Sequence, residues 1–139
     1  MKIDFVNGGS EFELPIVSSE SDIQMTIDLL KLQIHAEKET AQEMCLDVRE
    51  MKRELQKAQE DPYYALSDDA KSYNSIMAIQ LNLDTVYYIL HRIDATVTKE
   101  HVSTLGGTRL AEIVMAIFPA VEKKKDFPKA AKTTVADVN

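Results

Sequence analysis

The most constraining feature of this sequence is a series of residues that steps alternately by four and three positions from Ile23 to Ala58. A repeat averaging 3.5 residues is typical of a helix that packs one stripe against another helix. Glu37 alone interrupts the apolar character of the series, so we expect a helical protein organised by helix packing. The members of this apolar series are Ile23, Ile27, Leu30, Ile34, Glu37, Ala41, Met44, Val48, Met51, Leu55 and Ala58.

The length of this series leaves two alternatives open. One continuous helix over residues 20–60 would span about 60 Å, which is longer than a compact domain of 139 residues is wide. Either the helix protrudes, or it breaks near Glu37–Thr40, where the series turns polar and Thr40 is placed to cap a second helix.

The two halves of the series differ in width. In the first half, Met25, Leu29 and Leu32 broaden the apolar face, which predicts a core-facing helix. After Lys38 the apolar face becomes a narrow stripe among charged residues, which is typical of a two-helix contact. We predict a protein-interaction surface there, and its alternative is packing against the helix over residues 76–97. The five predicted interface residues are Ala41, Met44, Val48, Met51 and Leu55.

A second long helix is expected after Asp61-Pro62, which should end the first one. Ser67 reads as an N-cap, and the pattern then continues to about Ala95. Two long helices joined by a short loop favour an antiparallel pair. The apolar positions of the second helix repeat as regularly as those of the first: Ile76, Ile79, Leu83, Val86, Leu90, Ile93 and Val97.

Turn signals place the remaining elements. Asn7-Gly8-Gly9 between two alternating runs predicts a β-hairpin whose second strand covers residues 10–16. Thr98 and Thr108 are expected to cap two short helices, the last one ending at Phe118. The predicted fold is therefore mainly α: an antiparallel helical bundle with two long helices, a short N-terminal β-hairpin and shorter C-terminal helices.

We expect one domain over residues 1–121, with the hairpin at residues 1–17. Residues 122–139 contain five Lys and no apolar repeat, and we expect them to form a disordered tail.

Charge argues against two classes of partner. The net charge is −7, and the tail holds a balance of +2, so the folded body is at −9. An acidic body is repelled by nucleic acid phosphates and anionic lipid, so we expect neither as a partner. No apolar run is long enough to span a membrane, and no signal peptide is visible at the N-terminus. Together with the single cysteine, Cys45, this predicts a cytoplasmic protein.

The sequence offers no convincing catalytic constellation. The glycine pairs match no nucleotide-binding loop, and His35 with Glu39 lacks the further ligands of a metal site. Cys45 reads as a small apolar filler, and Asp84 is expected to face water. We therefore expect no catalytic, cofactor-binding or metal site, and a protein that is not an enzyme.

The order of elements supports a family resemblance. Met1-Lys2-Ile3-Asp4-Phe5, a Gly turn and Phe12-Glu13-Leu14-Pro15 precede an acidic helical body. Residues 97–102 (Val-Thr-Lys-Glu-His-Val), an apolar helix over residues 110–117 and a Lys-rich end follow. This order resembles the tail assembly chaperones of long-tailed phages and prophages of Gram-positive bacteria.

The resemblance implies a non-enzymatic chaperone that binds the helical tape-measure protein and helps to recruit the tail tube protein during virion assembly. The alternative is a coiled-coil adaptor or oligomerisation module with a protein partner, including a homo-oligomer. Surface apolar stripes on helices suit both roles.

Overall fold

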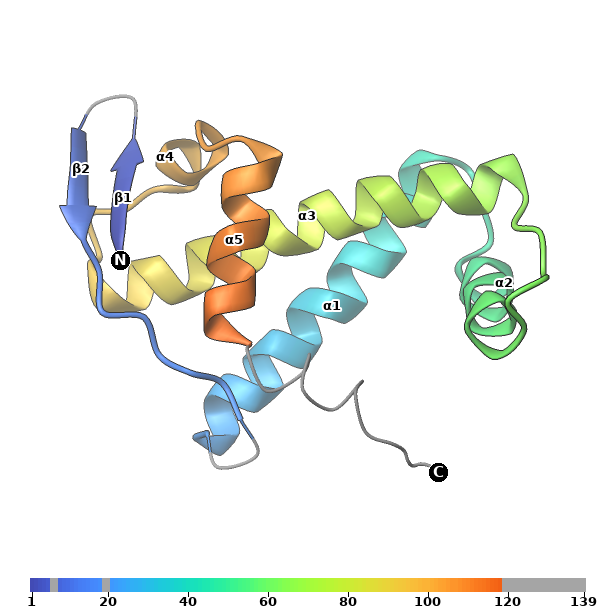
Figure 1. Cartoon of the computed structure of the whole chain (residues 1–139), viewed down its shortest axis with the longest axis horizontal. Coiled ribbons are helices and arrows are strands. Elements are labelled where there is room, and N and C mark those ends of the chain that lie inside the picture. The colour runs from blue at the N-terminus through green and yellow to red at the C-terminus, as the bar shows by residue number, and fades with distance from the viewer. Residues whose placement is uncertain (6–7, 19–20, 119–139) are drawn as a thin grey trace. The chain divides into compact units, whose positions relative to one another are not determined.

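The computed structural model describes residues 1–5, 8–18 and 21–118, and these are mainly helical (Figure 1). This confirms the predicted fold class, with an antiparallel hairpin at the N-terminus. The predicted tail at residues 122–139 and the turn residue Asn7 lie outside the described residues. The elements in chain order are β1 (Lys2–Phe5), β2 (Gly8–Glu11), α1 (Ile23–Glu43), α2 (Val48–Glu60), α3 (Asp68–Ile93), α4 (Lys99–Ser103) and α5 (Gly107–Ile117).

The described structure divides into two compact units, and the expectation of one domain over residues 1–121 stays a prediction. The first, which we call the hairpin unit, comprises Met1–Ile23 with Val86–Asn139, and the second, the helical unit, comprises Gln24–Thr85. The helical unit contains α2, nearly all of α1 and the first part of α3.

The hairpin pairs Lys2 with Glu11 and Phe5 with Gly8. Its second strand is Gly8–Glu11, so the prediction of a strand over residues 10–16 was wrong. Hydrogen bonding between the two segments continues one residue pair beyond β2, in the register of the ladder: the Phe12 N–H donates to the Met1 carbonyl at 2.8 Å. The N-terminal ammonium in turn donates to the Phe12 carbonyl at 2.7 Å. Phe12 is thereby held in a buried position.

Within the hairpin unit, the hairpin contacts α4 and α5. The Phe5 ring stacks on His101 of α4 with centroids 5.5 Å apart, and Arg109 of α5 donates to the Lys2 carbonyl. Thr98 caps α4 as predicted, in a capping box completed by the His101 side chain. The cap of α5 was predicted wrongly: it is Gly106, and Thr108 lies inside the first turn.

The helical unit shows where the long apolar series breaks. The helix ends at Glu43 and restarts at Val48, and Figure 1 shows α1 and α2 as separate helices. The predicted break at Glu37–Thr40 was therefore wrong by several residues. Two local features explain why the helix is interrupted between Glu43 and Val48. Cys45 has a φ of 58°, and the Asp47 carboxylate accepts from the Arg49 N–H at 2.8 Å.

The core of the helical unit is a small apolar cluster. Its buried members are Ala41, Met51, Ala70 and Tyr73, and six partly buried side chains pack around them. The Tyr73 hydroxyl donates to the Glu37 carbonyl of α1 at 3.3 Å, which ties α3 to α1. The six surrounding residues are Met44, Leu46, Val48, Leu55, Leu66 and Met77.

Candidate protein-interaction surface

The five predicted interface residues lie in the apolar cluster of the helical unit. Ala41 and Met51 are buried, and Met44, Val48 and Leu55 pack against the same cluster. In this structure the five residues thus pack inside the chain, together with residues of α3, which is the alternative to an interface that the sequence left open. Val48, Met51 and Leu55 follow one face of α2, since their spacing of three and four residues matches the helical repeat.

The first half of the apolar series lies on the surface, whereas Met25, Leu29 and Leu32, which were expected to broaden its core-facing side, are half-buried. Ile27, Leu30 and Ile34 of α1 are 40%, 55% and 50% exposed, and we call these three residues the exposed stripe. Ile23, at the start of the same helix, is also exposed. Successive members are three or four residues apart, so they form one continuous line along α1. Isolated exposed apolar residues are ordinary, whereas an aligned set is a candidate interaction site.

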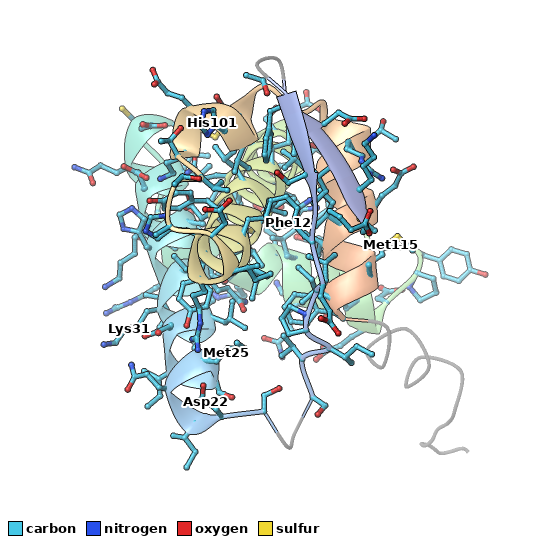
Figure 2. The ribbon with its side chains drawn as sticks, turned by 90° about the vertical axis from the view of Figure 1, so that its left-hand side faces the viewer. Phe12, Asp22, Met25, Lys31, His101 and Met115 are labelled. Atoms are coloured by element: carbon cyan, nitrogen blue, oxygen red, sulfur yellow. The ribbon has the colours of Figure 1, made fainter. Side chains whose placement is uncertain are left out.

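Two lysines border the exposed stripe on one side. Lys31 lies four residues after Ile27, and Lys38 lies four residues after Ile34. Both side chains are exposed, and Figure 2 shows Lys31 extending away from the α1 ribbon. These edge lysines were missed in the sequence. The signal was present, because charges beside a 3.5-residue repeat occupy the positions that select a partner helix.

A groove of about 640 Å³ lies among α1, α2 and α3 of the helical unit. Glu37 is nearly buried at this groove, where Lys52 pairs with it at 3.3 Å and the Gln33 amide donates to it at 3.3 Å. Glu37, which interrupts the apolar series in the sequence, is therefore one of the residues that line this groove. The groove is lined by Gln33, Glu37, Lys52, Leu55, Gln56, Ala58, Gln59, Glu60, Leu66, Asn74 and Met77.

The exposed stripe and the groove adjoin each other on α1. Gln33 is three residues after Leu30, and Glu37 is three residues after Ile34, so each pair shares a helix face. The members of the apolar series are therefore exposed along the stripe. Further along α1, Glu37 lines the groove and Ala41 belongs to the apolar cluster. A helix lying along the stripe would reach the groove at Gln33.

Other polar groups are explained by local structure. Asp84 was predicted to face water but is buried, and the Gln80 amide donates to its two carboxylate oxygens at 3.1 and 3.0 Å. Hydrogen bonds from the Thr96 hydroxyl and backbone N–H lower the pKa of Asp94, as is usual for a turn carboxylate. Cys45 is exposed in the turn after α1, so its prediction as an apolar filler was wrong.

The described residues contain no cluster of three or more His, Cys, Asp or Glu side chains arranged to hold a metal ion. A second, smaller cavity of about 220 Å³ in the hairpin unit is lined by both strands and His101. None of the helices in the described part of the chain has the length and apolarity needed to cross a membrane.

Comparison with known proteins gave no match: no family model, no curated protein and no solved structure is similar to this chain. Among the described residues, the exposed stripe with its lysine edge and adjoining groove is therefore the candidate functional surface.

Proposed function

We propose that this chain is a non-enzymatic protein-binding module that holds an apolar helix of a partner protein. In the role that the family resemblance implies, it is a phage tail assembly chaperone and its client is the helical tape-measure protein. The observation that carries the proposal is the exposed stripe, three aligned aliphatic side chains left uncovered on α1. Apolar residues at this spacing receive the apolar face of a second helix.

Two further features support a chaperone role. The net charge of −7 keeps a complex with an apolar client dispersed in water. Methionine is common in surfaces that accept varied partners, and Met77 lines the groove beside the stripe.

Co-expression with the tape-measure protein tests this proposal. We expect the tape-measure protein to stay in the soluble fraction and to co-purify with the wild-type chain. The variant Leu30→Asp should lose both effects, because it places a charge in the middle of the stripe. The matched control is Ser75→Asp, which adds the same charge at an exposed position of α3. Equal recovery of the tape-measure protein with both variants would contradict the proposal.

The gene neighbourhood provides an independent check. A chaperone of this class is expected to be encoded between the tail tube and tape-measure genes. Any other neighbourhood would remove the phage assignment and leave only a helix-binding module.

The alternative, an oligomerisation module, is favoured by one observation: the exposed stripe keeps the four-and-three spacing of a coiled coil. Light scattering on the purified chain separates the two. A stable oligomer that Leu30→Asp dissociates, with Ser75→Asp unchanged, would assign the stripe to self-association instead.

A further inference from the structure

We propose that the partner helix held by the exposed stripe carries acidic side chains along one edge of its apolar face, spaced about one heptad apart. These carboxylates would pair with the edge lysines, Lys31 and Lys38. This inference rests on the proposed function and specifies the chemistry of the partner that the same surface binds.

The spacing of the two lysines defines the expected pattern. They are seven residues apart on one helix, which places them on the same side of the stripe about 10.5 Å from each other. Each stands four residues after an aliphatic member of the stripe, so their ammonium groups border the apolar line rather than interrupt it. A partner helix docked along the stripe would place one of its own residues in every second turn next to Lys31 or Lys38.

Both edge lysines lack an ion-pair partner among the described residues. By contrast, Lys52 of the same unit pairs with Glu37, and Lys57 lies over the ring of Tyr64 at 5.9 Å. Two uncompensated cations beside an apolar stripe, in a protein of net charge −7, form a local positive edge. Such an edge selects a partner of opposite charge and disfavours one of like charge.

The residues on both sides of the stripe favour a helix of another protein, rather than a second copy of this chain, as the binding partner. The positions that border the stripe are Gln24, Lys31 and Lys38 on one side and Thr26 and Gln33 on the other. None of them is acidic, so pairing two copies of α1 along the stripe would leave the lysines without carboxylates. The charge pattern is satisfied by another protein whose helix supplies the acids.

Designed helical peptides of three heptads test this inference on the full chain. Both peptides carry Leu at the apolar positions; one has Glu and the other Lys at one edge position of each heptad. Fluorescence anisotropy of the labelled peptides measures binding. We expect the Glu-edged peptide to bind about tenfold more tightly than the Lys-edged one, as two modest ion pairs and their reversal would give.

Two controls make the result specific. Lys31→Glu with Lys38→Glu should invert the preference, whereas Arg53→Glu with Lys71→Glu, which changes the net charge equally at exposed positions, should leave it intact. The preference should also shrink in about 0.5 M NaCl, where exposed charges are screened.

The outcomes of these measurements separate charge selection by the edge lysines from helix binding by the stripe. If both peptides bind equally and the lysine variants change nothing, the edge has no selective role, although the stripe still binds helices. If neither peptide binds, the proposed function itself fails. If the lysine variants change the mass of the chain in light scattering and not peptide binding, a second copy occupies the stripe.

Discussion

The Tyr73 hydroxyl donates a hydrogen bond to the backbone carbonyl of Glu37, 36 residues earlier in the chain, at 3.3 Å. This bond joins α3 to α1 at the edge of the apolar cluster of the helical unit. It also places a phenol close to a nearly buried carboxylate. Burial, and then the charge of Glu37, raise the pKa of Tyr73 above its usual value of 10.0.

The raised pKa of Tyr73 predicts a loss of stability at alkaline pH. The folded protein favours the neutral phenol, so this contribution is complete below pH 10 and is lost as the pH rises further. We expect Tyr73→Phe to cost about 1 kcal/mol at pH 8, from the lost hydrogen bond, and less at pH 11. Urea unfolding followed by circular dichroism measures both differences. A cost that stays constant or grows with pH would contradict the shift.

The pair formed by Glu37 and Lys52 predicts strong coupling between the two residues. The Glu37 side chain is 11% exposed and the Lys52 side chain 57% exposed, at a distance of 3.3 Å. Lys52→Met should cost about 1 kcal/mol, because it leaves a nearly buried carboxylate without its cation. Adding Glu37→Met should recover most of that loss, since two apolar side chains then meet the apolar cluster. Additive losses in this double-mutant cycle would show that the pair is not coupled.

The sequence predicts the kinds of element well because each has a local cause. The hairpin follows from Gly8 and Gly9, the α4 cap from Thr98, and the length of α3 from its regular apolar repeat. The break between α1 and α2 could not be placed from the repeat. Met44 and Val48 are four residues apart, so the intervening turn keeps the phase of the repeat and looks like a continuous helix.

The candidate surface was harder to predict than the fold for a related reason. Periodicity shows that Ile27, Leu30 and Ile34 share a face with Ala41, but it does not show which part of that face is covered. In the structure, the second half of the series packs into the apolar cluster that the end of α1, α2 and the start of α3 form, so the exposed part is the half that looked most like a core. Which residues lie exposed depends on tertiary packing, which the apolar repeat does not contain.

Glycine at position 9 is required by close approach of the two strands. A Cβ at Gly9 would meet the Ile3 carbonyl at 2.7 Å and the Asp4 Cα at 2.8 Å, and both are backbone atoms. Gly9→Ala should therefore destabilise the protein by about 1–3 kcal/mol, as other overpacked substitutions do. The control is Gly107→Ala, where a Cβ meets nothing within 4 Å and a helix begins. That variant should be neutral or stabilising by up to about 1 kcal/mol. Thermal unfolding of the two variants under identical conditions compares them, and equal melting temperatures would contradict the clash.

The turn between α1 and α2 stores backbone strain at Cys45, whose φ of 58° lies in the left-handed region. A residue with a Cβ costs about 1 kcal/mol there, and glycine avoids most of that cost. We therefore expect Cys45→Gly to raise the free energy of unfolding by about 0.5–1 kcal/mol, as measured in urea. Cys45→Ala provides the matched control, because it removes the thiol and keeps the Cβ. Since the thiol is exposed, the alanine variant should be as stable as wild type. Stabilisation by both substitutions would trace the effect to the thiol, and stabilisation by glycine alone would locate it in the backbone of the turn that separates the two helices.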